Sequence, residues 1–284
     1  MKFSIRLLII IFTLKFSISF GQQNVDVIKD SVFSYAVDSY MRYNVILPKD
    51  YKQNKERYIT IFLLHGYSGN ENDWITRTSL VKYAKDFNYI IVTPDGKNSW
   101  YTNSPSKKKS DYEDYIIKEL IPNVKKKYRV ITTRHGRVIA GLSMGGYGAV
   151  KLAVKYPIYF YFAASFSGAF RFPSMIESNP GNLTESLKDA FGAKKSDHWL
   201  KNDVLVLADS ISNPNSIPYL YIACGKDDNL TGLLDSNKNL VDKLRKKNVL
   251  YEYHETPGTH NWVYWDKEVL NFLKRLSNFD PLKP

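Results

Sequence analysis

The chain has 284 residues, of which 44% are hydrophobic and 24% are charged, a balance typical of a globular protein with one large α/β domain. The formal net charge is +12, but the lysines are mostly dispersed and no nucleic-acid-binding motif accompanies them, so nucleic acid is not an expected partner. The single cysteine, Cys224, excludes an internal disulfide, and its apolar neighbours indicate a core position.

Residues 1–21 have the pattern of a secretory signal peptide. Two cations come first, Leu7 to Leu14 form a short apolar stretch, and small residues precede a cleavage point before Gln22. The apolar stretch is too short to span a bilayer, and a buried N-terminal strand is the alternative interpretation. The pattern therefore predicts a secreted or periplasmic, bacterial protein with one domain over 22–284 and no membrane span.

Two strands with alternating apolar and polar residues, Val32 to Ala36 and Tyr43 to Leu47, are predicted to open the sheet as an antiparallel pair. Tyr58 to Leu64 is almost continuously apolar, which is typical of a strand covered on both faces. From there on, predicted strands and helices alternate. Alternation of this kind predicts an α/β fold with a mostly parallel sheet and helices on both faces.

A glycine-containing loop, His65 to Gly69, follows directly on the first buried strand. Such a loop is where an oxyanion site is built, and the backbone N–H of Tyr67 is the candidate donor. A plain strand-to-helix turn is the alternative. We interpret His65 as a structural residue that holds the loop by hydrogen bonds, rather than as a general base.

The next strand, Tyr89 to Thr93, leads into a polar and aromatic segment that contains Trp100 and Tyr101. Doubly wound sheets bind ligands beyond the carboxyl ends of their strands, so both side chains are candidates for substrate contact, with loop packing as the alternative. Tyr112 to Lys127 then has a helical period, with a kink expected at Pro122.

Residues 138 to 148 carry the strongest local pattern. An apolar strand is followed by Gly-x-Ser-x-Gly, formed by Gly141, Ser143 and Gly145, and then by a helical stretch. Strand, sharp turn and helix are the context of a nucleophile elbow, in which glycines make room around a strained serine. The helix start directs its free N–H groups at the same place, so the N–H of Met144 is the second oxyanion candidate.

The remainder of the chain continues the alternation, with one interruption. Residues 169 to 216 contain several prolines and a short helix near Leu187, which predicts a cap-like insertion over the strand ends. The elements predicted around it are strands at Tyr161 to Phe166, Tyr219 to Cys224 and Leu250 to His254, and helices from Leu233 to Lys246 and from the His-Asn-Trp segment to Leu276.

Three strand-end loops carry the residue types of a serine hydrolase. In a parallel sheet these loops gather at one edge, which predicts that Ser143, Asp228 and His260 meet there. His260 would act as the base that activates the serine, and Asp228 would orient the histidine. Asp227 is the alternative acid, and His254 is a competing base. Trp262, two residues after His260, would wall the site or pack its own helix.

At this point the chain resembles the putative esterase group of α/β-hydrolases, over nearly the whole predicted mature chain. That group includes esterase D (S-formylglutathione hydrolase), feruloyl and acetyl xylan esterases of carbohydrate esterase family 1, tributyrin esterases and mycolyltransferases. The segments that carry the resemblance are YNVILPKDY (43–51), LLHGYSGNENDW (63–74), VTPDGKNSWY (92–101), ELIPNVKKKY (119–128), GLSMGGY (141–147), DAFG (189–192), CGKDDNL (224–230) and TPGTHNWVYW (256–265).

The resemblance implies the α/β-hydrolase fold, the triad Ser143, Asp228 and His260, oxyanion N–H groups from Tyr67 and Met144, and no metal or organic cofactor. With the predicted signal it implies a secreted serine carboxylesterase that acts on short-chain or aromatic acyl esters, as small molecules or on plant glycans. An acyltransferase of the same fold and a catalytically silent glycan-binding domain are the rival hypotheses. The sequence does not indicate an oligomeric state.

Overall fold

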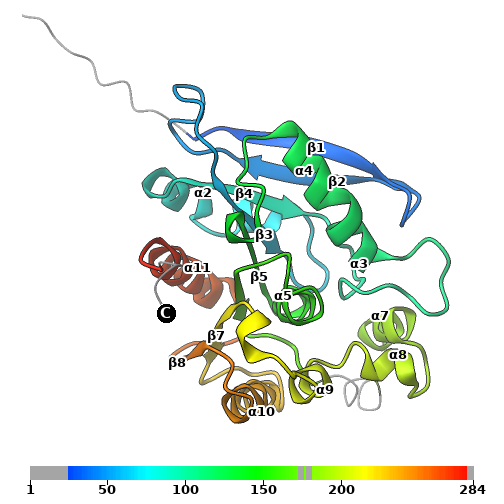
Figure 1. The fold of residues 1–284 in the computed structure, drawn as a ribbon. Coiled ribbons are helices and arrows are strands. Elements are labelled where there is room, and N and C mark those ends of the chain that lie inside the picture. Colours follow the sequence, from blue (N-terminus) through cyan, green and yellow to red (C-terminus); the bar gives the residue numbers. More distant parts are fainter. Residues whose placement is uncertain (1–24, 172–175, 177–180, 280–284) are drawn as a thin grey trace, which may run out of the picture.

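The structure, a computed structural model, describes residues 25–171, 176 and 181–279. The predicted signal peptide and the segments 172–175 and 177–180 of the predicted insertion lie outside the described residues. An eight-stranded sheet runs through the molecule in the order β1-β2-β4-β3-β5-β6-β7-β8 (Figure 1). Its strands are β1 (Val27–Ser34), β2 (Ser39–Ile46), β3 (Ile59–Leu64), β4 (Tyr89–Pro94), β5 (Arg137–Leu142), β6 (Phe162–Phe166), β7 (Tyr219–Gly225) and β8 (Tyr251–Thr256).

The sheet is parallel from β4 to β8, and β1 and β2 form an antiparallel extension at one edge. The prediction of a mostly parallel α/β sheet with an antiparallel opening pair is thus confirmed. The first strand begins at Val27, five residues before the predicted start at Val32, because the alternation there is weak and both faces of that segment are partly exposed.

Helices cover both faces of the sheet. They are α1 (Asp73–Thr76), α2 (Leu80–Tyr83), α3 (Tyr112–Asp114), α4 (Ile121–Lys127), α5 (Met144–Lys155), α7 (Asn182–Phe191), α8 (Asp197–Leu200), α9 (Val204–Asp209), α10 (Leu233–Lys246) and α11 (Trp262–Ser277). Shorter or non-α turns are η1 (Ala84–Asp86), η2 (Tyr115–Leu120), η3 (Arg134–Gly136) and η4 (Pro214–Ser216). In Figure 1, α2 and α11 lie on one side of the sheet, and α4 and α5 lie on the other.

Two separate apolar cores follow from the alternation of side chains along the buried strands. On β3, Leu64 packs into the core shared with α4, α5 and α10, whereas Leu63 packs into the core shared with α2 and α11. Both leucines are at most 1% exposed. The His-Gly loop therefore begins at a strand that is packed on both faces, which fixes the position of the first residue of the loop.

The segment predicted as one kinked helix at 112–127 is divided into three parts. A short α-turn leads into the π-helical turn η2, and α4 begins immediately afterwards with Pro122 in its first turn. Proline has no N–H to donate to the preceding turn, which suits a helix start. The expected irregularity is at the predicted place, with a π turn just before the proline.

Helices α7, α8 and α9 occupy the described part of the 169–216 segment. In Figure 1, α7 and α8 lie at a corner of the molecule away from β1 and α2. Helix α9 begins at an aspartate cap, since the Asp203 carboxylate accepts from the N–H groups of Leu205 and Val206. None of the helices within 25–171 and 181–279 is both long and apolar enough to cross a membrane.

Candidate active site

Ser143 sits at the turn between β5 and α5 with φ 50° and ψ −114°, a backbone conformation that residues other than glycine rarely adopt. Gly141 and Gly145 make this turn sterically feasible. A Cβ added to Gly141 would lie 2.5 Å from the carbonyl of Gly145, and one added to Gly145 would lie 2.5 Å from the carbonyl oxygen of Leu64. The two glycines are therefore required by backbone contacts on either side of the serine.

The structure brings Ser143, His260 and Asp228 into one hydrogen-bonded chain. The Oγ of Ser143 lies 2.9 Å from Nε2 of His260, and Nδ1 of the same ring lies 2.8 Å from Oδ2 of Asp228. The Asp228 side chain is fully buried and that of His260 is 13% exposed. In this chain the serine hydroxyl donates to Nε2 and the Nδ1–H donates to the carboxylate, an arrangement that can activate a hydroxyl.

The alternative acid and base occupy other positions. Asp227 is exposed, and its backbone N–H donates to the carbonyl of Gly258. The carboxylate that contacts His260 is that of Asp228. His254 lies in the edge strand β8, where Nε2 is 3.3 Å from Glu252 and the ring stacks on Tyr221. The geometry therefore selects Asp228 and His260 as the partners of the serine.

Glycine also sets the separation of the two loops that carry Asp228 and His260. A Cβ on Gly225 would lie 2.3 Å from the carbonyl oxygen of Gly258, so the two loops touch through their backbones. Immediately after His260, the side chain of Asn261 caps α11 by accepting from the N–H of Tyr264 at 3.0 Å. The histidine is thus held between a close loop contact and a capped helix start.

The two candidate oxyanion donors lie beside Ser143. Met144 is the first residue of α5, where the helix leaves backbone N–H groups free to bind an anion. The His-Gly loop that carries Tyr67 is adjacent, because a Cβ on Gly66 would lie 3.6 Å from Cβ of Ser143. The next residue, Ser68, has φ 61° and donates its N–H to Oδ1 of Asn98 at 2.7 Å, which ties the loop to the segment after β4.

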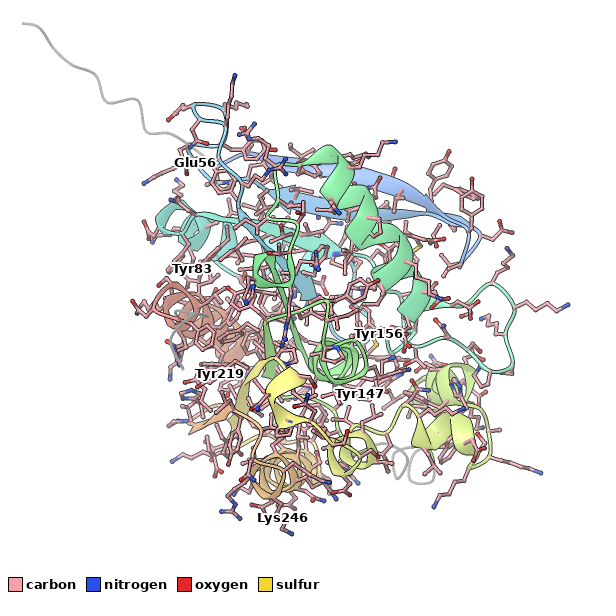
Figure 2. The ribbon with its side chains drawn as sticks, viewed as in Figure 1. Glu56, Tyr83, Tyr147, Tyr156, Tyr219 and Lys246 are labelled. Carbon is pink, nitrogen blue, oxygen red and sulfur yellow. The ribbon has the colours of Figure 1, made fainter. Side chains whose placement is uncertain are left out.

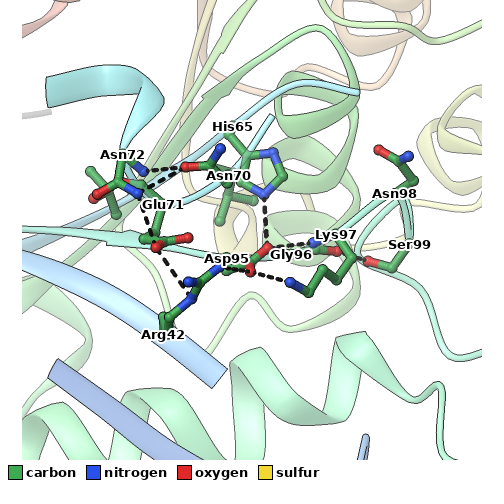
Figure 3. Close-up of polar contacts among 12 residues, drawn as sticks. Arg42, His65, Asn70, Glu71, Asn72, Asp95, Gly96, Lys97, Asn98 and Ser99 are labelled. Atoms are coloured by element: carbon green, nitrogen blue, oxygen red, sulfur yellow. Dashed lines mark hydrogen bonds and ion pairs between the residues drawn. The ribbon is translucent and has the colours of Figure 1, made fainter. Parts of the chain in front are cut away.

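A buried polar network lies behind this loop (Figure 3). Nδ1–H of His65 donates to the carbonyl of Gly66 at 2.7 Å, and Nε2 accepts from the N–H of Gly96 at 2.8 Å. Burial acts to raise the pKa of the neighbouring Asp95 carboxyl, but the ammonium and the backbone N–H of Lys97 lower that pKa to well below its usual range. His65 is 1% exposed and ties the His-Gly loop to the loop after β4, in agreement with its interpretation as a structural residue.

Arg42 extends the network to the adjacent antiparallel strand. Its guanidinium lies 3.3 Å from Glu71 and 3.8 Å from Asp95. The ammonium of Lys97 lies 2.6 Å from the same Asp95 carboxylate. Glu71 and Asp95 are nearly buried, whereas Arg42 and Lys97 are more than half exposed. The two buried carboxylates are therefore paired with cations at the surface, and this pairing offsets the free-energy cost of burying their charges.

An aromatic cavity of about 500 Å³ opens over Ser143 and His260. Of the side chains predicted to contact substrate, Trp100 and Trp262 line it. Trp262 also packs edge-to-face against Trp74 at 5.5 Å and Trp265 at 5.2 Å, so it serves both as a wall and in helix packing. A cavity of this size and character accommodates a small acyl or aromatic group.

The expectation of a direct contact at Tyr101 is corrected. Its side chain is 0% exposed, it is not among the cavity-lining residues, and its hydroxyl donates to the carbonyl of His65 at 3.0 Å. A Cβ on Gly148 of α5 would lie only 2.6 Å from the Tyr101 ring, so the ring fills a slot against the elbow helix. Tyr101 supports the site through packing, the alternative that the sequence left open.

Trp100 and Tyr101 are consecutive residues with φ 55° and φ 51°, so the loop that orients Trp100 is strained. The buried ammonium of Lys151, on α5, donates to the carbonyl of Tyr101 at 2.6 Å and to Thr102 at 2.8 Å. It also pairs with Glu113 at 2.8 Å. Burial lowers the pKa of Lys151 to about 8. The elbow helix thereby clamps the loop that carries the cavity wall.

Two tyrosines that are labelled in Figure 2, Tyr147 on the same helix and Tyr156 just after its end, fix it at two further points. The hydroxyl of Tyr147 donates to the carbonyl of Asn202 at 2.6 Å, and that of Tyr156 donates to Glu113 at 2.6 Å. The first bond ties α5 to the segment between α8 and α9, and the second ties its end to α3. The helix that follows Ser143 is therefore held near both ends by hydrogen bonds, one buried and one partly buried.

Several cavity-lining residues were missed by the sequence reasoning: Arg77, Leu183, Leu230 and Trp265. Helical spacing could have found Trp265, since it lies three residues after Trp262 and shares its helix face. The guanidinium of Arg77 lies 5.5 Å from the ring centroid of Trp262, a contact with no local sequence signal. No group of three or more His, Cys, Asp or Glu residues within the described part of the chain is arranged to hold a metal ion.

Comparison with known proteins adds independent observations. A family model described as "Putative esterase" matches residues 34–276. An acetyl esterase of Caldicellulosiruptor saccharolyticus is 29% identical over 245 residues, which cover 82% of this chain and 91% of that protein. An esterase of Mycobacterium tuberculosis is 30% identical over 242 residues, which cover 76% of this chain but 52% of that longer protein.

Two solved structures are similar over most of the chain. The first is FphF of Staphylococcus aureus, described as a fluorophosphonate-binding serine hydrolase, with a TM-score of 0.81 and 27% identity over 90% of this chain and 100% of that chain. The second is described as a ferulic acid esterase, with a TM-score of 0.77 and 27% identity over 90% of this chain and 98% of that chain.

Proposed function

Because this chain belongs to the putative esterase family and is a carboxylesterase of the α/β-hydrolase fold, we propose that Ser143, His260 and Asp228 are its catalytic triad. The observation that carries the proposal is the continuous hydrogen-bonded chain from Ser143 Oγ through both nitrogens of His260 to the buried Asp228. Tyr67 and Met144 supply the oxyanion N–H groups.

The first half of the reaction forms an acyl-enzyme. Ser143 Oγ attacks the ester carbonyl carbon while Nε2 of His260 takes the hydroxyl proton. The carbonyl oxygen becomes negative and accepts hydrogen bonds from the N–H groups of Tyr67 and Met144. The carbon–oxygen bond to the alcohol then breaks, and His260 gives the proton to the departing alcohol, leaving the acyl group on Ser143.

The second half returns the free enzyme. A water molecule gives one proton to Nε2 of His260 and attacks the acyl carbon, and the same two N–H groups stabilise the second oxyanion. The bond to Ser143 breaks as His260 returns the proton to Oγ, and the carboxylic acid leaves. Throughout both halves Asp228 keeps the Nδ1–H of His260 fixed and stabilises the imidazolium when it forms.

The cavity supports short-chain or aromatic acyl esters as substrates. Its walls include Trp100, Trp262 and Trp265, which offer flat apolar surface on which an aromatic acyl group packs edge-to-face or stacks. Relatives named as acetyl esterase and ferulic acid esterase act on esters at the two ends of this range. Esters of this kind on plant glycans are included in the proposal.

The proposal extends to export and to domain organisation. The pattern of residues 1–21 supports cleavage before Gln22 and release of a single esterase domain, 22–284, in which 169–216 is a cap-like insertion. Sequencing the N-terminus of the protein recovered from the culture medium or periplasm would give Gln22 first. Recovery in the cytoplasm with Met1 retained would exclude export.

Hydrolysis of a p-nitrophenyl ester series from acetate to octanoate, together with methyl ferulate and acetylated xylan, tests the function. Wild type is expected to turn over at least the short esters, and Ser143→Ala to lose roughly four to six orders of magnitude in kcat because the nucleophile is gone. Circular dichroism and thermal unfolding establish that the variant is folded. Hydrolysis by a folded Ser143→Ala at close to the wild-type rate would refute the triad.

A further inference from the structure

A second hollow, of about 590 Å³, adjoins the active-site cavity. Tyr67 and Ser68 line both spaces. Helix α7 also contributes to both, with Leu183 facing the cavity and Asn182 facing the hollow. The wall between them includes Trp100, whose indole N–H donates to Ser186 Oγ at 3.2 Å. The hollow and the cavity therefore share the middle of the candidate oxyanion loop.

The chemical character of the two spaces differs. The cavity over Ser143 is walled mainly by aromatic and aliphatic side chains, whereas the hollow presents amide and hydroxyl groups such as Asn98, Asn182 and Ser186. The hollow also presents the half-buried rings of Tyr67 and Tyr112. Amides and hydroxyls donate and accept hydrogen bonds, and a tyrosine ring offers a flat apolar surface with a polar edge.

The charged side chains around the hollow are compensated. Lys97 lies 2.6 Å from Asp95, and Lys107 lies 3.5 Å from Asp189. Glu185 lies 2.8 Å from Lys188, on the same helix. Every Lys, Asp and Glu among the described residues that line the hollow is thus in an ion pair, so the space favours an uncharged polar ligand over an anion or a cation.

We propose that this hollow binds the sugar residues of an oligosaccharide whose esterified position lies over Ser143. Sugars carry many hydroxyls that both donate and accept, and their C–H faces pack on aromatic rings, which matches the groups in the hollow. The inference rests on the proposed esterase function, because Tyr67 would hold the ester carbonyl on one side of the loop while its alcohol portion reaches the hollow on the other.

One hydrogen bond connects the hollow to the candidate oxyanion loop. Asn98, at the wall of the hollow, accepts from the N–H of Ser68, the residue after the candidate oxyanion donor Tyr67. A sugar bound beside Asn98 would therefore lie against the support of the oxyanion loop. Binding in the hollow therefore raises kcat/KM for acylation by sugar esters. It does not change kcat/KM for simple esters, which have no sugar to place there.

Asn182→Trp tests the proposal with Lys201→Trp as matched control. Asn182 is exposed on α7 and lines the hollow, so an indole there occupies part of it. Lys201 is exposed at the end of α8, in the same 169–216 segment, and lines neither space. The substrates are acetylated oligosaccharides of xylose, mannose and glucose, with p-nitrophenyl acetate as the simple ester of the same acyl group. Both variants are expected to fold, since neither position is buried.

We expect Asn182→Trp to lower kcat/KM by about tenfold or more for at least one acetylated oligosaccharide, the loss of roughly one or two hydrogen bonds, with p-nitrophenyl acetate unchanged within about twofold. Lys201→Trp should change neither. The proposal is overturned if Asn182→Trp affects sugar esters and p-nitrophenyl acetate equally, or affects neither, or if wild type hydrolyses none of the sugar esters. In all three cases Ser143-dependent turnover of p-nitrophenyl acetate would leave the proposed triad intact.

Discussion

Asp227 and Asp228 are adjacent residues of the same type with different surroundings. The carboxylate of Asp228 is buried against Nδ1 of His260 and also accepts from the N–H of Leu230 at 3.0 Å, whereas Asp227 is exposed. Only the buried carboxylate can fix the tautomer of His260 and stabilise its charged form.

The pair gives a prediction with an internal control. Asp228→Asn keeps the shape but removes the charge, and kcat is expected to fall by about 10⁴-fold because the amide no longer holds Nδ1–H toward itself. Asp227→Asn is expected to retain activity within about threefold. Steady-state kinetics on a short p-nitrophenyl ester measures both. The reverse order of the two effects would assign the acid to Asp227.

At the scale of single residues, the sequence predicted the backbone conformation correctly where glycines constrain it. The glycines around Ser143 predicted its strained turn because no other residue fits there. The sequence was undecided for Asp227 and Asp228 because the side-chain direction depends on a loop packed against Gly258, far along the chain. It could not separate Trp100 from Tyr101, because two consecutive positive φ angles turn one ring toward the cavity and the other into the core.

Helix α11 shows how one element positions a side chain of the proposed triad. It begins at Trp262, two residues after His260, and its first turn depends on the Asn261 side chain, which accepts from the N–H of Tyr264. The close backbone contact between Gly225 and Gly258 before it and the cap after it hold His260 beside Ser143. Stability of the helix start and orientation of the histidine are therefore linked.

Removal of the cap separates these two effects. Asn261→Ala is expected to lower the free energy of unfolding by about 1 kcal/mol and to lower kcat, because the helix start and the adjacent His260 become less ordered. Asn261→Ser, which can still cap the helix, is expected to restore most of both. Urea unfolding and kinetics on the same samples measure them. Equal losses in the alanine and serine variants would contradict the capping role.

At this scale the helices with a clear apolar period were predicted well, and irregular segments were not. Helix α10 has the predicted bounds, Leu233–Lys246, because its apolar face repeats at helical spacing. The segment 112–127 also had that spacing, but no local pattern indicates that the turn before Pro122 is π-helical. The path of α7 over the cavity is equally set by tertiary contacts, such as the bond between Ser186 and Trp100.

The buried charges around Glu113 connect three distant parts of the molecule. Its carboxylate lies 2.8 Å from Lys151 and 2.7 Å from Lys155 on α5, and Lys151 in turn holds the loop that carries Trp100. Burial acts to raise the pKa of Glu113, but the two ammonium groups lower it to about 2 from the usual 4.5. Breaking such a pair leaves a buried, uncompensated charge.

The lowered pKa gives a pH-dependent prediction. A carboxyl with a depressed folded-state pKa contributes its full stability above pH 4.5 and loses it as the pH falls toward 2, a contribution of about 3 kcal/mol here. Glu113→Gln should therefore be markedly less stable than wild type at pH 7, and the difference should narrow below pH 4.5. Urea unfolding at pH 7, 5, 4 and 3 measures it.

The control for this series is Glu185→Gln, at an exposed ion pair on α7. Its side chain is 67% exposed, so the change should shift the free energy of unfolding by less than about 1 kcal/mol at every pH. A wild-type to Glu113→Gln difference that stays constant from pH 7 to pH 3 would contradict the assigned role of the carboxylate.

For the whole molecule, the alternation of strands and helices was sufficient to predict the sheet and the edge at which the site lies. Parallel strands place their following loops together, so Ser143, Asp228 and His260 could be grouped from chain order alone. The shape of the cavity was not predictable, because Arg77 and Leu183 reach it from α1–α2 and α7, segments whose positions no local pattern determines.

The measurement that tests the central claim most directly is the site of covalent modification by a fluorophosphonate. Wild type is expected to take up one phosphonyl group per chain, located on Ser143 by peptide mass spectrometry, and His260→Ala to react far more slowly because the hydroxyl is no longer activated. Modification of a different residue, or labelling of a folded Ser143→Ala variant at the wild-type rate, would contradict the assignment of Ser143 as the nucleophile.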